Sequence, residues 1–335
     1  MNIQSVFCTL VSRNLSTQGE RVIKSHTHID NSDCFHGILS CNIEMHKLFE
    51  TISKAAKTDA SIYISGETGV GKELVARAIH AESPRAKEPF IAVNVANFSS
   101  ELIESQLFGH KKGAFTGALK NSTGLLQAAK KGTLFLDEIA CLTPSTQAKL
   151  LRVLQERQYY PVGDVNLQKF SASVISASNL TLEEAIKRHQ FREDLRYRLE
   201  VIPLRVPPLR DRRDDIMLLF EHFLEQASGS DNWKINSALE TKLINHHWPG
   251  NVRELENCAR FAAAMATNRQ LKLSDLPESV QSTLEFQIAK NTPVLNAEII
   301  SEALASNGGN RAVTAEYLGI SRMTLWRKMK AFNLT

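Results

Sequence analysis

The 335-residue sequence contains no apolar run near the roughly 20 residues that a membrane-spanning helix needs. Its first residues, Met1 to Val11, are mildly apolar, but they lack a basic start and a small-residue cleavage site, and Arg13 interrupts them, so a secretory signal is not indicated. The five cysteines are odd in number and show no metal-ligand spacing, which predicts reduced thiols in a cytoplasmic protein. They are Cys8, Cys34, Cys41, Cys141 and Cys258.

The pattern of the chain changes several times, which predicts about two or three domains at this length. Residues 1–34 are polar, without a sustained helical or strand period, and form a short lead-in. The pattern then favours an α/β domain over 35–205, a small helical lid over 206–266 and a polar linker over 267–293. Residues 294–335 form a last helical domain.

A glycine-rich turn lies between a predicted strand, Ser61 to Ser65, and an apolar helix. Its glycines let backbone amides converge on phosphate oxygens, and Lys72 can reach the β and γ phosphates. A chance glycine turn is the alternative, and the correct order of strand, loop and helix argues against it. The generic motif ends in a Mg²⁺-binding hydroxyl where this chain has Glu73. The predicted nucleotide-binding residues of this loop are Gly66, Glu67, Thr68, Gly69, Val70, Gly71, Lys72 and Glu73.

Two carboxylates follow a second hydrophobic strand, which lies within 132–139. Ligands of parallel sheets bind at the carboxyl ends of the strands. Asp137 can therefore hold Mg²⁺, and Glu138 can orient and deprotonate an attacking water. An Asp-Glu pair alone is often only a helix start, but together with Lys72 it predicts an ATPase whose cofactors are ATP and Mg²⁺.

A third stretch places a bare aromatic and a hydroxyl between glycines, which allow sharp bends and close approach. We interpret it as a projecting loop with Phe115 and Thr116 at its tip. The hexapeptide alone is equally compatible with an ordinary turn whose phenylalanine returns to the core. The stretch consists of Gly113, Ala114, Phe115, Thr116, Gly117 and Ala118.

The sequence Phe108-Gly-His-Lys-Lys-Gly-Ala-Phe-Thr-Gly-Ala118 resembles the GAFTGA signature of sigma-54-dependent transcriptional activators, the bacterial enhancer-binding proteins. This resemblance implies an AAA+ P-loop ATPase with a parallel sheet and a small helical lid. It also implies a ring hexamer whose GAFTGA loop contacts sigma-54 RNA polymerase. Glu73 fits the family pattern, whereas Lys111 stands where the family usually has an acidic residue. The chain has no room for a receiver or other sensory domain, which predicts control by a separate regulatory protein or by expression level.

The same resemblance assigns roles to five further residues. Asn94 would restrain the catalytic glutamate, Asn179 would sense the γ-phosphate, and Arg253 would report hydrolysis to the lid. Arg192 and Arg198 would reach the ATP site of a neighbouring subunit. The residues by themselves leave alternatives open: Asn94 fits a turn at a strand end, and the arginines fit a solvated helix surface of mixed charge.

The pattern of the carboxyl-terminal segment predicts a helix-turn-helix. Residues 307–335 contain five basic side chains and one acidic side chain. Gly309-Asn-Arg311 and Leu318-Gly-Ile-Ser-Arg322 resemble the Fis-type DNA-binding domain, which implies a dimer on double-stranded upstream DNA. Leu325 and Met329 are predicted core residues. Which side chains read bases and which touch phosphates stays open. The predicted DNA contacts are Arg311, Ser321, Arg322, Thr324, Arg327 and Lys328.

Together these patterns predict an ATP-hydrolysing activator that remodels the sigma-54 polymerase to the open complex. A different remodelling ATPase of the same class is one alternative, and the intact GAFTGA stretch argues against it. A DNA-binding repressor that has lost remodelling is the other. The intact residues Lys72, Asp137, Glu138 and Thr116 argue against that alternative. The sequence does not identify the promoter, the operator or the regulated process.

Overall fold

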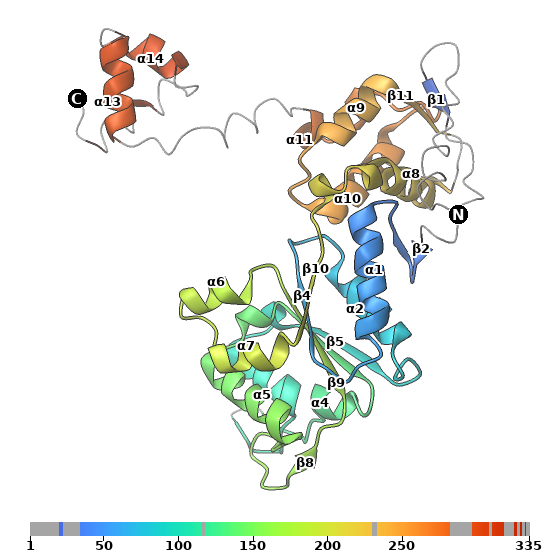
Figure 1. Ribbon diagram of the computed structural model, residues 1–335, viewed down its shortest axis with the longest axis vertical. Coiled ribbons are helices and arrows are strands. Elements are labelled where there is room, and N and C mark those ends of the chain that lie inside the picture. Colours follow the sequence, from blue (N-terminus) through green and yellow to red (C-terminus); the bar gives the residue numbers. More distant parts are fainter. Residues whose placement is uncertain are drawn as a thin grey trace, which may run out of the picture. The chain divides into compact units, whose positions relative to one another are not determined.

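The computed structural model describes residues 20–22, 34–115, 118–229, 233–281, 297–307 and 310–317, together with Leu325, Trp326, Met329 and Phe332. The chain divides into two compact units, Met1–Leu276 and Pro277–Thr335. The first unit contains a sheet with its flanking helices and a helical lid, and the second contains short helices (Figure 1). No helix in these ranges is long and apolar enough to cross a membrane.

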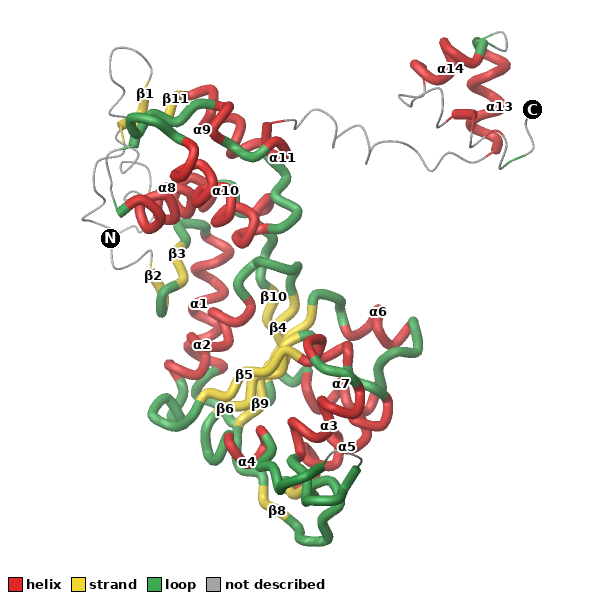
Figure 2. The backbone as a smooth tube through the Cα atoms, turned by 180° about the vertical axis from the view of Figure 1, so that it is seen from behind, coloured by secondary structure: helices red, strands yellow, loops and turns green. Residues whose placement is uncertain are grey.

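A five-stranded parallel sheet forms the centre of the first unit, in the order β10-β4-β9-β6-β5 (Figure 2). Strand β9 therefore separates β4, which precedes the glycine-rich turn, from β6, which precedes the two carboxylates. The α/β fold predicted from the sequence is confirmed. The strands are β4 (Ile62–Ser65), β5 (Phe90–Asn94), β6 (Thr133–Asp137), β9 (Ser173–Ser178) and β10 (Ile202–Arg205).

Helices cover both faces of this sheet, with α1 and α2 on one side and α5 and α7 on the other (Figure 1). Successive strand residues point to opposite faces, so Tyr63 and Leu134 belong to one core and Ile64 and Phe135 to the other. The near-continuous burial of these strands is what a parallel sheet covered on both faces requires. The helices are α1 (Ile43–Ala55), α2 (Lys72–Glu82), α3 (Ser100–Phe108), α4 (Leu125–Ala128), α5 (Pro144–Glu156), α6 (Leu182–Lys187) and α7 (Glu193–Leu199).

Local capping sets the helix boundaries. The Asn42 side chain accepts a hydrogen bond from the Glu44 amide and so begins α1. Thr143 caps α5 in the same way, and Pro144 occupies the first helical position, where a missing amide costs nothing. Arg157 ends α5 in the left-handed conformation, with φ of 56°.

The lid is built on α8 (Asp214–Ser228), which packs against α10 (Asn251–Met265), with α9 (Ser237–Asn245) beside them. Strand β11 (Lys234–Asn236) pairs antiparallel with β1 (Glu20–Val22). The lead-in therefore adds a short strand to the lid, although its sequence shows no strand period, because three residues are too few to reveal one.

Part of the predicted linker packs on the lid. Leu271 and Leu276 are each 1% exposed, and the Leu271 amide donates to the Lys234 carbonyl at 3.0 Å. A 3₁₀ turn, Leu273–Asp275, lies between the two leucines. Two apolar side chains in a polar stretch are thus enough to attach residues 267–276 to the lid.

The second unit contains α11 (Glu278–Gln281), α13 (Ala297–Ser306) and α14 (Arg311–Tyr317). Ile300, Ala315, Leu325 and Met329 form one buried cluster, so the core positions predicted for Leu325 and Met329 are confirmed. Arg311 is exposed at the start of α14. The other predicted DNA contacts, Ser321, Arg322, Thr324, Arg327 and Lys328, lie outside the described residues.

A buried carboxylate joins the lid to the segment before α1. Asp215 is fully buried and accepts hydrogen bonds from the Ser40 hydroxyl at 2.7 Å and the Cys41 amide at 2.8 Å. The Asn42 amide donates to the same carboxylate at 3.2 Å. The Arg212 guanidinium lies 3.7 Å away and supplies the compensating charge.

Replacing Asp215 with Ala should therefore lower the free energy of unfolding by about 3–5 kcal/mol, because Arg212 is left as an uncompensated buried charge. The neighbouring Asp214 is exposed in the same helical turn and serves as the control. Asp214→Ala should cost less than about 1 kcal/mol. Urea titrations followed by circular dichroism measure both losses, and equal losses would contradict a special role for the buried carboxylate.

Candidate nucleotide site and projecting loop

Three strand ends meet at one edge of the sheet. The glycine-rich turn follows β4, Asp137 ends β6, and Asn179 follows β9 directly. Because β9 lies between the other two strands, Asn179 is placed between the turn and the carboxylates. The structure thus brings together the residues predicted from three separate parts of the sequence.

Lys72 lies at the start of α2 with its side chain only 7% exposed. Its ammonium group donates to the carbonyls of Gly66 at 2.8 Å and Glu67 at 3.3 Å. Burial lowers the pKa of Lys72, while the carboxylates of Glu138 and Asp137 oppose that shift. The ammonium can exchange its carbonyl partners for phosphate oxygens without leaving the turn.

The two carboxylates after β6 have different surroundings. Glu138 adopts the left-handed conformation, with φ of 53°, and this turns its side chain toward the glycine-rich loop. One oxygen lies 3.9 Å from the Lys72 ammonium, and the other accepts from the Asn179 amide at 3.3 Å. Asp137 accepts from the Glu138 amide at 3.0 Å. Glu138 is therefore positioned between the predicted phosphate lysine and the predicted sensor.

Asn94 faces Asp137 across the register of β5 and β6. Its amide nitrogen donates to Asp137 Oδ2 at 3.3 Å, and its oxygen accepts from the Ala96 amide at 2.9 Å. In the described residues it makes no hydrogen bond to Glu138, the partner that the resemblance suggests. The structure thus pairs Asn94 with the predicted metal ligand instead of the predicted base.

This donor set fits a nucleotide and Mg²⁺. The described residues contain no group of three or more His, Cys, Asp or Glu side chains that could enclose a metal. Mg²⁺ commonly binds one or two carboxylates and completes its shell with water and phosphate oxygens. Asp137 would supply that carboxylate, and the bound metal would neutralise charge on the phosphates. A Cβ at Gly71 would meet only the Leu74 side chain, at 3.9 Å, so the mouth of the turn is open.

The lid contacts the other side of this turn. Asn251 is fully buried, and its amide donates to the Glu67 carboxylate and to the Thr68 carbonyl, both at 3.1 Å. Arg210 forms two hydrogen bonds with the same carboxylate. Mainly through Arg210, the pKa of Glu67 falls from the usual 4.5 to about 2. The Glu67 carboxylate, a predicted nucleotide-binding group, is therefore directed toward the lid.

Gly69 lies against the lid without room for a side chain. It has φ of 82°, and a Cβ there would lie 2.2 Å from the Gly250 carbonyl oxygen, so any larger residue would displace the lid. The Arg253 amide donates to the Gly69 carbonyl at 3.3 Å, and the Arg253 side chain is exposed. Its charge adds to the lowering of the Lys72 pKa, which places the predicted lid sensor near the phosphate lysine.

The three arginines of α7 and its cap differ in their partners. Arg192 forms an exposed ion pair with Asp194 at 2.7 Å. Arg196 pairs with Glu183 and Glu200. Arg198 is exposed and forms no ion pair within the described residues. The family resemblance implies that Arg192 and Arg198 reach the ATP site of a neighbouring subunit. In this structure neither arginine contacts the nucleotide turn of its own chain.

The projecting loop is described except for Thr116 and Gly117. Hydrogen bonds join Gly113 to Ala118 at 2.9 Å and Ala118 to Phe115 at 3.0 Å. Phe115 is 44% exposed and meets the His110 ring edge-on, with the ring centroids 5.0 Å apart. Phe115 is therefore outside the core, as the projecting-loop interpretation predicts.

A second hairpin beside this loop was missed from the sequence. It consists of β7 (Gln158–Tyr159), β8 (Gln168–Lys169) and the turn between them. Val162 exchanges backbone hydrogen bonds with Gly109 and Lys111, and the Lys111 ammonium lies 3.3 Å from Asp164. Exposed apolar side chains cluster on the hairpin: Tyr160, Val165 and Leu167. The turn residues Pro161, Gly163, Asp164 and Asn166 are the signal that the sequence offers for it.

An apolar cavity next to the turn was also missed. It lies between β3 (Ile38–Leu39), the start of α2 and the lid helices α8 and α10. Such a lining suits a flat heterocycle whose phosphates reach the turn. The residues that line it include Ile38, Leu39, Met45, Val70, Leu74, Leu219 and Val252.

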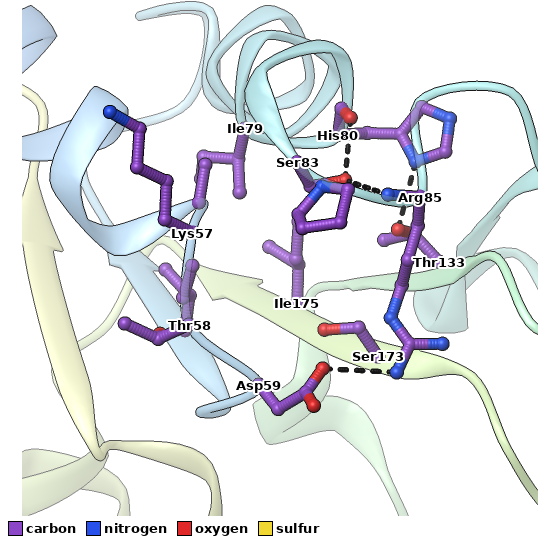
Figure 3. A pocket seen from close by; sticks show the side chains of 13 residues that line it. Lys57, Thr58, Asp59, Ile79, His80, Ser83, Arg85, Thr133, Ser173 and Ile175 are labelled. Carbon is purple, nitrogen blue, oxygen red and sulfur yellow. Dashed lines mark hydrogen bonds and ion pairs between the residues drawn. The ribbon is translucent and has the colours of Figure 1, made fainter.

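A larger cavity, about 250 Å³, lies at the opposite edge of the sheet, away from these residues. Figure 3 shows the Arg85 side chain directed at Asp59 and the His80 ring directed at Thr133. The Arg85 guanidinium lies 3.0 Å from the Asp59 carboxylate, and His80 Nδ1 lies 2.9 Å from the Thr133 hydroxyl. Arg85 also donates to the carbonyls of Lys131 and Ser171. Arg85, Asp59, His80 and Thr133 thus have hydrogen-bond partners within the protein. We interpret their role as structural, because they connect segments at the amino-terminal ends of the strands.

The fold and the site of the first unit define an AAA+ P-loop ATPase. Family comparison agrees and identifies the segment after it as a Fis-type helix-turn-helix domain. Residues 38–205 match the sigma-54 interaction domain, 210–292 match the AAA+ ATPase lid domain, and 294–332 match the bacterial regulatory protein, Fis family. The chain therefore belongs to the sigma-54-dependent activator family, as the sequence resemblance predicts.

Several curated relatives support this assignment. The regulatory protein AtoC of Escherichia coli K12 is 41% identical over 97% of this chain and 74% of its own length. The nitrogen fixation protein AnfA of Azotobacter vinelandii is 40% identical over 87% of this chain, which spans 56% of AnfA. The crystal structure of NtrX from Brucella abortus with ADP is similar, with a TM-score of 0.68, 34% identity, and coverage of 88% of this chain and 70% of NtrX.

The lowered pKa of Glu67 predicts a pH-dependent stability. A carboxyl group whose pKa falls on folding stabilises the fold fully above its unfolded value, near 4.5, and loses that contribution as pH falls toward about 2. Arg210→Gln should remove part of this stabilisation and lower the free energy of unfolding by about 1 kcal/mol above pH 5. The loss is small because Glu67 is partly exposed and solvent weakens its ion pair with Arg210. Urea titrations at pH 6, 4 and 2.5 measure the difference.

Arg205→Gln is the matched control, because Arg205 is exposed and lies nearby at the end of β10. The difference between wild type and Arg210→Gln should shrink toward zero at the lowest pH. A difference that stays constant over the whole range would show that Arg210 does not act through the Glu67 carboxylate.

Proposed function

We propose that this protein is an ATP-hydrolysing transcriptional activator of the bacterial cytoplasm. It binds upstream double-stranded DNA and remodels the sigma-54 RNA polymerase to the open complex through the Gly113–Ala118 loop. ATP with Mg²⁺ drives this motion in a ring hexamer assembled from DNA-bound dimers. A separate regulatory protein or the level of expression controls its activity.

One arrangement carries the catalytic part of this proposal. The Glu138 carboxylate lies between the Lys72 ammonium and the Asn179 amide, at 3.9 Å and 3.3 Å. A water between Glu138 and a γ-phosphate held by Lys72 would be oriented for in-line attack, and Glu138 would accept its proton. Asp137 would hold the metal, with Asn94 fixing the direction of that carboxylate.

The proposed partner contacts lie on three segments: the projecting loop, the β7–β8 hairpin and the carboxyl-terminal helical domain. Phe115 and the exposed residues of the β7–β8 hairpin lie on neighbouring segments and offer an apolar surface to sigma-54. Arg311 and the basic residues that follow it contact the DNA, whose negative charge attracts them. Arg198 is unpaired within the described residues, which suits an arginine supplied to the ATP site of a neighbouring subunit.

The remodelling step is tested by complex formation with purified sigma-54 in the presence of ADP and aluminium fluoride, which together imitate the transferring phosphate. Sizing chromatography should show a complex that requires the nucleotide mixture. Phe115→Ala or Thr116→Ala should weaken it about 10- to 100-fold, because a buried anchor is lost from the interface.

Leu273→Ala, which removes an equally exposed apolar side chain from the lid segment, should leave the complex intact. ATP hydrolysis without any nucleotide-dependent complex would mean that the ATPase acts on a target other than sigma-54.

The trans arginine is tested by mixing two inactive variants. Glu138→Gln lacks the base, and Arg198→Ala lacks the arginine, which in comparable systems contributes about 10³- to 10⁵-fold in rate. Each variant alone should hydrolyse ATP at background rates. Mixed rings contain interfaces with both an intact base and an intact arginine, so activity should return in part, as measured by phosphate release.

Lys187→Ala, which removes an exposed cation from α6, is the control and should hydrolyse ATP at the wild-type rate. If the mixture of Glu138→Gln and Arg198→Ala stays inactive although native mass spectrometry shows mixed rings, Arg198 does not act across the subunit interface.

A further inference from the structure

Three consecutive carbonyl groups of the nucleotide turn are each bound by a lid donor. The Thr68 carbonyl accepts from the Asn251 side chain at 3.1 Å. The Gly69 carbonyl accepts from the backbone amide of Arg253 at 3.3 Å. The Val70 carbonyl accepts from the Arg212 guanidinium at 3.1 Å. The lid thus holds the middle of the turn, residues 68–70, by its carbonyl groups.

The direction of a carbonyl fixes the direction of the next amide, because the peptide unit is planar and its C=O and N–H groups point opposite ways. No peptide bond in the described residues is cis. When the carbonyls of Thr68, Gly69 and Val70 point to the lid, the amides of Gly69, Val70 and Gly71 point away from it. Amides that point in this direction are the groups that would bind phosphate oxygens in such a turn.

We infer that the lid sets the phosphate site: Arg212 and Asn251 orient the phosphate-binding amides by holding the carbonyls behind them. Both are positioning residues, and neither needs to touch the nucleotide. This inference rests on the proposed nucleotide site at Lys72. It adds that the affinity of this site for phosphate depends on residues from the lid.

The two side-chain donors are themselves held in place. The Asn251 oxygen accepts from the Leu209 amide at 2.8 Å, and its nitrogen also donates to Glu67. Arg212 is 2% exposed and lies beside the buried Asp215 carboxylate. Buried groups of this kind have few alternative positions, so a lid displacement would carry the carbonyls with it or break their hydrogen bonds.

The coupling acts in both directions, because the free energy that links two sites is reciprocal. If the lid improves phosphate binding, bound phosphate must favour the lid position that makes these three hydrogen bonds. Loss of the γ-phosphate would then be transmitted to the lid through the peptide units of the turn, in addition to any direct contact made by the Arg253 side chain.

The test measures the affinity of the full chain for inorganic pyrophosphate and ADP by isothermal titration calorimetry. Arg212→Lys keeps the charge beside Asp215 and loses the hydrogen bond to Val70. Asn251→Gly keeps the backbone conformation, whose φ is 53°, and loses the side-chain amide. Each variant should bind pyrophosphate about tenfold more weakly than wild type.

Two reference variants separate the outcomes. Leu239→Ala removes a buried lid side chain of α9 that bears no hydrogen bond to the turn. It should lower the unfolding midpoint yet bind pyrophosphate like wild type. If it weakens binding as much as the other variants do, general loosening of the lid explains the effect, and the inference is overturned.

Lys72→Ala tests the underlying site. If it abolishes ADP binding while Arg212→Lys and Asn251→Gly bind pyrophosphate like wild type, the nucleotide site stands and the role of the lid is wrong. If Lys72→Ala binds ADP as wild type does, the proposed nucleotide site is wrong, and the inference fails with it. Should Asn251→Gly not fold, Arg212→Lys decides alone.

Discussion

The order of the parallel sheet is the constraint on which the rest of the site depends. With β9 between β4 and β6, the glycine-rich turn, the carboxylates and Asn179 share one edge although they are far apart in sequence. The positive φ of Glu138 then turns its side chain across β9 toward Lys72. Neither feature suffices alone, because a strand end fixes a backbone position and the local turn fixes the direction of the side chain.

The charged groups at this edge are balanced by partners within the protein. The Lys72 ammonium is nearly buried, and it is satisfied by two carbonyls of its own turn and by a carboxylate at longer range. Across the turn, Glu67 is satisfied by Arg210 and Asn251. The positive group that would bind phosphate and the negative group that binds the lid thus have separate partners on opposite sides of one short loop.

Much of the fold and the arrangement of the candidate site could be predicted from the sequence, because their signals are local. The strand before the glycine-rich turn and the strand before the two carboxylates follow from the sequence pattern, and β4 and β6 lie where that pattern predicts them. The contact of Arg210 with Glu67, 143 positions apart, has no local signal. Glu67 therefore reads as a nucleotide ligand in the sequence although its carboxylate faces the lid.

The β7–β8 hairpin was missed for a related reason. Its strands have two residues each, too few for an alternating pattern. Its position is fixed by backbone hydrogen bonds between Val162 and both Gly109 and Lys111, which no side-chain pattern encodes. A short paired segment of this kind gains its order from the loop against which it packs.

The same hairpin explains how the chain accommodates Lys111, which stands where the family usually has an acidic residue. Lys111 lies 3.3 Å from Asp164, whose carboxylate is only 7% exposed. The Asn166 amide, and after it Lys111, lower the pKa of Asp164, so the acid stays ionised and the lysine has a charged partner. The reversed charge at position 111 is thus balanced on the neighbouring hairpin, and it ties the stem of the projecting loop to that hairpin.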